Sequence, residues 1–440
     1  MSTIENIDVN YKRPKTYNTA KYPIRQPRFF TGLIWTLSKI TLMNKKYKVE
    51  KINMEGLKPP YMMLSNHMEF IDFKLAAMVT GSHRVNNVAS VDGYYRRAWL
   101  MEWIGTIGTR KYTTDIHMVK SIYKVLRRGD VLSMYPEARY CPAGVPSYIP
   151  DSLGMLIKRA KVPVVTVVHH GNHLHMPFWN YKGKRKVPLH TVATKILTPE
   201  DIEKMSAAEI LARVKESLTY NEYEYQKENG ILIKEKNRAE GLHKILYQCP
   251  HCMTESKMAS KGAEIFCTEC GKRWTLEESG ELSANDGETE FATVPEWYAW
   301  EREQVKAEIE RGEYRFEAEV DVYTLPRLKR FISLGKGKVT HDAEQGFVVE
   351  GEYRGKTYRV HRAPIQMHSL HVEYSYCHYL HKDCFDISTE KDSFFCYPGE
   401  NCNVITKLAF ATEIIYQMHE AETLMAKVGR KKSAEPVSAE

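Results

Sequence analysis

An alternation of strand-like and helix-like segments between residues 49 and 200 limits the possible folds more than any other feature of the sequence. Short apolar runs typical of buried strands occur at residues 61–65, 86–91, 130–135, 162–168 and 190–197. Segments with helical spacing of apolar residues lie between them, at 70–79, 94–103, 114–128 and 151–160. This alternation predicts an α/β domain with a mainly parallel central sheet, whose catalytic residues collect in the loops after the strands.

The first of these loops carries an octet, Ser65 to Asp72, that directly follows an apolar run. We expect His67 to lie at the C-terminal end of a strand and Asp72 early in the next helix, where the helix dipole favours a carboxylate. A carboxylate bound to one ring nitrogen fixes the tautomer of a histidine and leaves the other nitrogen free as a base. The alternative is that Asn66 caps the helix, Asp72 is an ordinary first-turn acid and His67 has no chemical role.

Two later loops also carry residues suited to a charged ligand. The loop from Gly105 to Lys111 contains Arg110, whose planar guanidinium fits a phosphate, and its glycines allow a ligand to approach the backbone. Glu137 and Arg139 follow the strand-like run 130–135 and form an acid and base pair suited to orienting an acceptor. Considered alone, each loop also fits a purely structural interpretation. The first would be a turn with a surface arginine, and the second a structural ion pair.

Together these segments resemble a known family. The sequence contains Asn-His-x-x-x-x-Asp, Gly-x-x-x-x-Arg, aromatic-Pro-Glu-x-Arg and Val-Pro-Val-Val in this order, over roughly residues 55–200. This order is similar to that of the glycerolipid acyltransferases, the family of bacterial 1-acylglycerol-3-phosphate acyltransferases. The third block of that family usually reads Phe-Pro-Glu-Gly-Thr-Arg-Ser, whereas residues 135–140 read Tyr-Pro-Glu-Ala-Arg-Tyr. We therefore expect the acceptor pocket to differ from the usual one.

The resemblance implies an O-acyltransferase of phospholipid biosynthesis. It assigns His67 as the base that deprotonates the acceptor hydroxyl and Asp72 as its partner. Arg110, Glu137 and Arg139 would bind the substrate, with Arg110 on the acceptor phosphate. The acyl donor would be an acyl-CoA or an acyl carrier protein, and the acceptor a lysophosphatidate-like glycerolipid.

The N-terminal residues are those expected of a membrane-surface anchor. Residues 1–26 are polar and basic and are interpreted as a flexible arm, and residues 27–48 as an amphipathic interfacial helix. Apolar side chains recur in the second segment at helical spacing, and Lys45, Lys46 and Lys48 follow them. The alternative is a core helix packed on the domain behind it, because periodicity does not separate the two cases.

The location in the cell is predicted from two features that the sequence lacks, a membrane span and a secretory signal. No run of the sequence reaches the about 18 apolar residues of a membrane span. The chain has 9 cysteines, an odd number, and no secretory signal, which indicates a reducing compartment. We therefore expect a cytoplasmic protein that lies peripherally on the inner membrane face.

Four of the cysteines form two pairs with metal-ligand spacing. Cys249 and Cys252 form one Cys-x-x-Cys turn, and Cys267 and Cys270 form the other. This spacing predicts a zinc ribbon over residues 247–276 in which four thiolates hold a structural zinc and leave no position open for a substrate.

The rest of the chain is predicted as a helical connector at 201–246, a linker and helix at 277–312, an antiparallel β-rich domain with a C-terminal helix at 313–426, and a disordered tail at 427–440. In a second class of function the zinc ribbon carries the activity. The chain would then be a nucleic-acid-binding or adaptor protein whose acyltransferase-like domain is not catalytic. The net charge of +8 permits nucleic acid. However, the basic residues gather near 12–48 and 84–186, away from the ribbon. This distribution argues against nucleic-acid binding by the ribbon.

Overall fold

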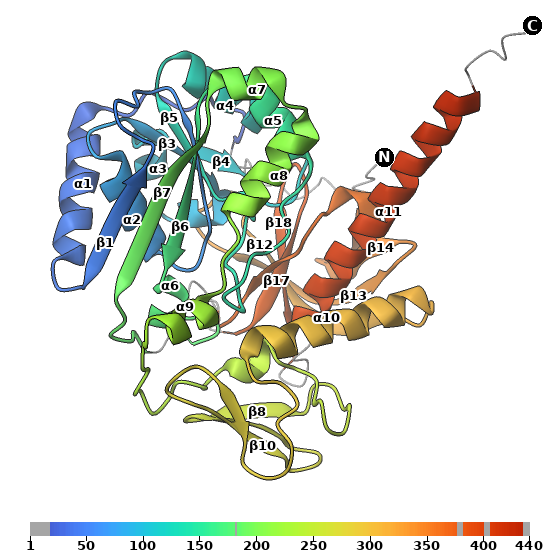
Figure 1. Ribbon diagram of the computed structural model, residues 1–440. Helices are drawn as coiled ribbons and strands as arrows, with labels where there is room; N and C mark the ends of the chain where they lie inside the picture. Colours follow the sequence, from blue (N-terminus) through green and yellow to red (C-terminus); the bar gives the residue numbers. More distant parts are fainter. Residues whose placement is uncertain (1–17, 181–182, 376–381, 400–404, 434–440) are drawn as a thin grey trace, which may run out of the picture.

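The computed structural model describes residues 18–180, 183–375, 382–399 and 405–433, with side chains as far as residue 423. Its first part is a seven-stranded sheet with the order β1-β7-β6-β2-β5-β3-β4 (Figure 1). The strands are β1 (Tyr47–Ile52), β2 (Met62–Ser65), β3 (Val85–Ser90), β4 (Ile107–Thr109), β5 (Val131–Met134), β6 (Val164–His170) and β7 (Leu189–Leu197).

The sheet confirms the predicted α/β fold with mainly parallel strands. Strands β2 to β6 are parallel to one another, whereas β7 is antiparallel to β6 and parallel to β1. All five strand-like runs form strands. β1 and β4 were not predicted, because β1 is an edge strand whose Lys48, Glu50 and Lys51 interrupt any apolar run, and β4 has 3 residues.

Helices cover both faces of this sheet. The helices of this part of the chain are α1 (Arg28–Leu42), α2 (Ile71–Thr80), α3 (Ala98–Trp103), α4 (Ile116–Arg127), α5 (Ser152–Ala160), α6 (Asn172–His175), α7 (Pro199–Lys204), α8 (Ala207–Ser217) and α9 (Glu222–Glu228). Neighbouring residues of β2 serve opposite faces, because side chains alternate along a strand. Met63 packs with Ala76 of α2, whereas Leu64 packs with a cluster that includes Ile122 of α4 and Val214 of α8. Residues 207–217 of the predicted connector therefore belong to the α/β core.

The second part is a small antiparallel sheet with the order β11-β10-β9-β8. Its strands are β8 (Met258–Lys261), β9 (Glu264–Cys267), β10 (Arg273–Leu276) and β11 (Leu282–Ala284). Trp274 of β10 lies against Trp297 of α10 (Val294–Glu310), with 5.0 Å between ring centroids. This contact holds the small sheet on α10, which lies between it and the C-terminal sheet (Figure 1).

The third part is the predicted antiparallel β region closed by a helix. It is a seven-stranded sheet with the order β15-β14-β13-β12-β18-β17-β16. The strands are β12 (Arg315–Thr324), β13 (Ile332–Asp342), β14 (Gly346–Tyr353), β15 (Lys356–Arg362), β16 (His371–Glu373), β17 (Cys384–Ser388) and β18 (Ser393–Pro398). Helix α11 runs from Ile405 to Ser433, so the first residues of the predicted tail are helical.

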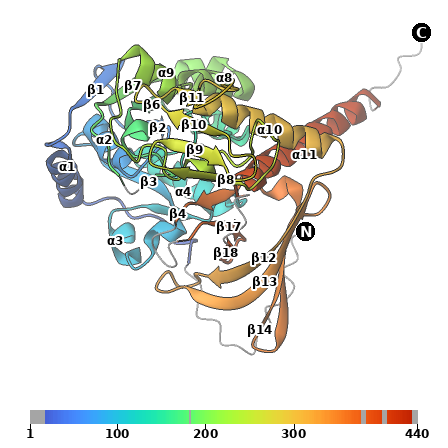
Figure 2. The ribbon, with the colours of Figure 1, turned by 90° about the horizontal axis from the view of Figure 1, so that it is seen from below.

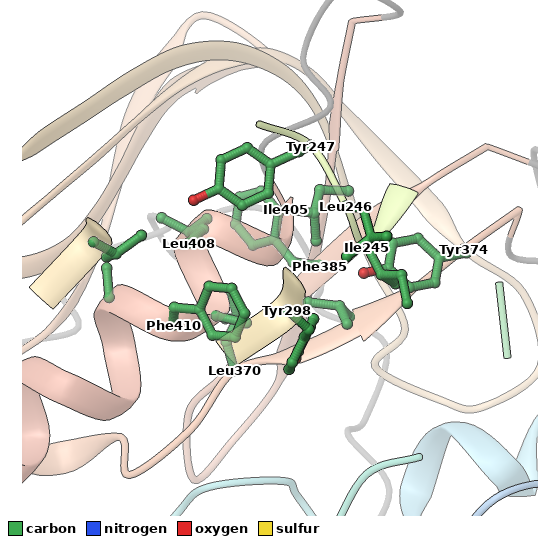
Figure 3. Close-up of a cluster of buried hydrophobic side chains, with 14 of the residues drawn as sticks. Ile245, Leu246, Tyr247, Tyr298, Leu370, Tyr374, Phe385, Ile405, Leu408 and Phe410 are labelled. Carbon is green, nitrogen blue, oxygen red and sulfur yellow. The ribbon is translucent and has the colours of Figure 1, made fainter. Parts of the chain in front are cut away.

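One hydrophobic core joins the segment before the small sheet, α10, the C-terminal sheet and α11. Figure 3 shows Tyr247, Tyr298, Phe385 and Phe410 converging in this core from four different segments of the chain. The rings of Tyr298 and Phe410 meet edge to face at 4.6 Å. Residues 245 and 246, predicted to end the connector, and Tyr247, predicted to begin the zinc ribbon, therefore lie in a core.

The described part of the N-terminal arm is docked on the α/β domain. Arg25 Nε is 3.1 Å from Asp130 Oδ1, and Arg128 donates hydrogen bonds to the carbonyls of Pro23 and Ile24. Gln26 is buried and accepts a hydrogen bond from Thr31 Oγ1. These contacts fix the direction in which the chain enters α1.

Candidate active site

His67 and Asp72 form a dyad in the turn between β2 and α2. His67 Nδ1 lies 2.9 Å from Asp72 Oδ2, and the same oxygen accepts the backbone N–H of Met68 at 2.6 Å and of Glu69 at 3.0 Å. Asn172 Nδ2 donates to the other oxygen, Oδ1, at 2.6 Å. The carboxylate thus holds Nδ1 and leaves Nε2 of His67 with no hydrogen bond to the described residues.

The geometry contradicts the alternative in which Asn66 is a helix cap. Its side chain instead bridges to β6, where Oδ1 accepts from the backbone N–H of His169 at 2.8 Å and Nδ2 donates to the carbonyl of the same residue. Helix α2 begins after Phe70 without a side-chain cap. Asn66 therefore ties the dyad loop to the neighbouring strand.

Asp72 is held as a carboxylate although it is fully buried. Burial acts to raise its pKa, but the hydrogen bonds from His67 and Asn172 and the charge of nearby histidine rings together keep that pKa below its ordinary value. A buried negative charge next to Nδ1 stabilises the imidazolium that forms when His67 takes up a proton.

Two tyrosines enclose the ring of His67. Tyr135 stacks on it with 3.8 Å between centroids and 13° between planes, and Tyr140 lies at 4.3 Å on a tilt. Burial, followed by the carboxylates of Glu373 and Asp72, raises the pKa of Tyr140. The side chain of His67 remains 20% exposed, and Phe70 nearby is 62% exposed. The base therefore has aromatic walls and an open edge.

The buried side chain of Glu137 stabilises the loop that follows β5 by accepting hydrogen bonds. Its Oε2 accepts the backbone N–H of Ser147 at 2.6 Å and the thiol of Cys141 at 2.8 Å. Burial raises the pKa of Glu137 to about 7. Cys141 is fully buried, and burial raises its thiol pKa well above the ordinary value, so it is not an activated nucleophile.

The two arginines that were predicted to bind the substrate are buried between the α/β domain and the C-terminal part. Arg139 Nη2 is 3.0 Å from Glu413 Oε1 of α11, and its Nε donates to Ser147 Oγ at 3.3 Å. Arg110 donates to Ser393 Oγ of β18 at 3.4 Å. The relative exposure of these arginines is 5% and 3%. Sequence reasoning could not find Glu413 and Ser393, because they come from distant segments without a motif.

The four cysteines come together as predicted, and their spacing fits a metal. Cys249 Sγ is 3.8 Å from Cys270 Sγ, and Cys252 Sγ is 3.7 Å from Cys267 Sγ. A tetrahedron with metal–sulfur bonds of about 2.3 Å has edges of about 3.8 Å. Gly271, with φ of 81°, allows one turn to close around the site. Four converging sulfurs can hold a metal ion such as zinc.

In the part of the chain that the structure describes, no helix is both long enough and apolar enough to cross a bilayer.

Comparisons with known proteins add a distant structural likeness. No family model matches the chain, and no curated protein matches it. Among solved structures, it is similar to the 1-acyl-sn-glycerophosphate (LPA) acyltransferase PlsC from Thermotoga maritima, at 16% identity and a TM-score of 0.35, over 43% of this chain and 79% of that chain. A likeness at this TM-score carries no argument about function. The function proposed below therefore rests on the geometry of the site.

Proposed function

We propose that this chain is an O-acyltransferase that moves a fatty acyl group from a thioester donor to the hydroxyl of a lysophosphatidate-like glycerolipid. The observation that carries the proposal is the His67–Asp72 dyad, in which Nδ1 is bonded to a buried carboxylate, Nε2 has no hydrogen bond to the described residues, and the side chain is 20% exposed. This is the arrangement of a general base for a hydroxyl group.

The reaction needs no covalent enzyme intermediate. The acceptor hydroxyl gives its proton to His67 Nε2 while its oxygen attacks the thioester carbonyl. The tetrahedral intermediate then expels the thiolate, which takes the proton back from the imidazolium as the ester forms. Asp72 stabilises the imidazolium between these steps. The buried, unactivated thiol of Cys141 has no role in this sequence.

Three lysines are better placed than the arginines to hold the acceptor phosphate. Lys45 and Lys74 are partly exposed, lie close to the carboxylate of Glu69, and share Lys184 as a charged neighbour. Burial, together with this mutual repulsion, lowers the pKa of Lys45 and of Lys74. An anion is stabilised where cations repel one another. Phosphate binding by Arg110 and Arg139 would require Ser393 and Glu413 to move away.

The surface next to the dyad supports peripheral binding to a membrane. Helix α1 buries Thr31, Ser38 and Leu42 but exposes the apolar side chains of Leu33, Leu37 and Ile40, so most of its apolar side faces away from the core. Figure 2 shows α1 and α3 at one side of the molecule, and the rings of Phe30 and Trp103 join them at 6.2 Å. We define the apolar face as the exposed residues Phe29, Leu33, Leu37, Ile40, Met43, Phe70, Trp99 and Trp103. Such a face inserts among lipid headgroups and places the base at the surface that holds the acceptor.

The test uses purified protein with anionic vesicles that contain lysophosphatidate and either acyl-CoA or acylated carrier protein. Mass spectrometry is expected to show phosphatidate with the wild type and none above background with His67→Ala. The control is His117→Ala on α4, which should keep full activity. Lys74→Gln should raise KM for lysophosphatidate and leave that for the donor unchanged. Undiminished activity of a folded His67→Ala protein would refute the proposal.

A further inference from the structure

A second group of metal-ligand side chains lies where the C-terminal sheet meets the α/β domain. Asp92 follows β3 in the 3-10 turn η1 (Val91–Tyr94), and His371 and Glu373 are on β16. One ligand atom of each lies within 4.8 Å of the others, and His371 Nε2 is 3.2 Å from Glu373 Oε1. The site thus draws its donors from two sheets that are far apart in the sequence.

The histidine is oriented as a metal ligand would be. Its Nδ1 donates to Asp386 of β17, which lies directly opposite it in the antiparallel pair. Ser388 Oγ donates to the other oxygen of Asp386 at 3.2 Å. A carboxylate on one ring nitrogen turns the other nitrogen toward the metal in many histidine sites. Here that other nitrogen, Nε2, faces the carboxylate of Glu373.

Asp92 gives a second, independent indication. Its Oδ1 is shielded from solvent and has no hydrogen-bond partner among the described residues. A buried carboxylate oxygen without a donor is costly, and nearly all such atoms in native proteins are satisfied by a proton donor or an ion. The unsatisfied oxygen belongs to the same residue that completes the cluster with His371 and Glu373.

The charges of the cluster favour a divalent cation. The carboxylates of Asp92, Glu373 and Asp386 surround His371, while Lys111 is the neighbouring cation that acts on Asp92 and His371. The ligand atoms of Asp92 and Glu373 lie within 4.8 Å of each other, so their carboxylates repel one another, and a divalent cation between them relieves that repulsion. One imidazole and two carboxylates are a ligand set that suits zinc or manganese.

We propose that Asp92, His371 and Glu373 bind a divalent zinc or manganese ion that joins the C-terminal sheet to the α/β domain. Asp386 positions His371 and is not itself a ligand. Three protein ligands leave a coordination position open, unlike the four cysteines. The ion would lie near Tyr140, whose ring lies tilted against His67 and which is electrostatically close to Glu373 and Asp92.

The test measures metal content in the full-length protein, so it does not depend on acyl transfer. Protein with its cysteine site loaded with zinc is titrated with manganese, a hard ion that thiolates bind poorly. The wild type is expected to bind one further ion per chain, seen by electron paramagnetic resonance, and to gain thermal stability. Asp92→Asn and Glu373→Gln are each expected to weaken binding by about 10-fold or more, while Asp286→Asn in an exposed loop has no effect.

Two results would overturn the proposal. Wild-type protein that takes up neither manganese nor a second zinc would mean that a protonated His371 satisfies the carboxylates. Equal binding by the wild type and both variants would place the ion elsewhere. If Asp92→Asn does not fold, Glu373→Gln decides the question, because Glu373 is 17% exposed and its loss leaves the buried carboxylates in place.

Discussion

Arg139 and Glu413 form a buried ion pair that joins the loop after β5 to helix α11. Their side-chain atoms Nη2 and Oε1 are 3.0 Å apart, and Arg302 and Ser369 also donate hydrogen bonds to Glu413 at 2.6 and 2.7 Å. Burial acts to raise the pKa of Glu413, but Arg139 and Arg302 keep it below the ordinary value. This carboxylate therefore holds the C-terminal helix against the residues that follow the dyad.

Replacing this carboxylate should be costly. Glu413→Gln leaves the buried guanidinium of Arg139 without a full counter-charge, and we expect a loss of about 3 to 5 kcal/mol in the free energy of unfolding. Urea denaturation followed by circular dichroism measures the loss. The control is Glu422→Gln on the same helix, whose side chain is 72% exposed and whose change should be small. Equal midpoints for the two variants would show that the ion pair contributes nothing.

Glu137 should make stability fall as pH rises toward neutrality. Its pKa is about 7 in the folded protein against an ordinary 4.5, because of burial. Below 4.5 both states are protonated and there is no effect. Between 4.5 and 7 the unfolded state loses its proton and the folded state keeps it, so up to about 3 kcal/mol of stability is lost, and the loss persists at higher pH.

Glu137→Gln removes this titration. The variant should lose less stability than the wild type between pH 5 and pH 8, as measured by urea unfolding at the two values. Glu216→Gln, at a residue whose side chain is 74% exposed, should keep the wild-type dependence. An unchanged pH dependence in Glu137→Gln would mean that the carboxyl is already ionised in the folded protein.

The apolar face should be needed for vesicle binding. Leu37→Glu places a charge where the acyl chains would be, so flotation with anionic vesicles should fall by about 10-fold or more. Leu232→Glu is a matched control, because both leucines are 54% exposed and Leu232 lies outside the apolar face. Equal flotation of the two variants would contradict a docking role for α1.

The cysteine site should hold one zinc ion per chain. Cys267→Ser is expected to lose it, and the change should also be seen in tryptophan fluorescence, because Trp274 packs against Trp297 beside the site. Cys141→Ala is the control and should keep the metal. Full zinc content in Cys267→Ser would show that these sulfurs are not the ligands.

The residues of the dyad could be predicted because both of them lie in one short stretch of the sequence. His67 and Asp72 are five positions apart, and a strand-to-helix turn brings them together without help from distant segments. The same holds for the paired cysteines, in which each turn supplies two ligands. The charged edge strand β1 and the short strand β4 escaped prediction, because their sequences lack the apolar run that identifies a buried strand.

The sequence by itself determined the α/β alternation, the dyad, the cysteine turns and the antiparallel C-terminal region, because each depends on spacing within a short stretch. The tertiary structure alone decided what the arginines contact. Arg139 is paired with Glu413 and Arg110 bonded to Ser393 because α11 and β18 fold over them. It also decided that Asp92 meets His371. Contacts between segments hundreds of residues apart leave no periodic signal in the chain, since they depend on how whole layers pack.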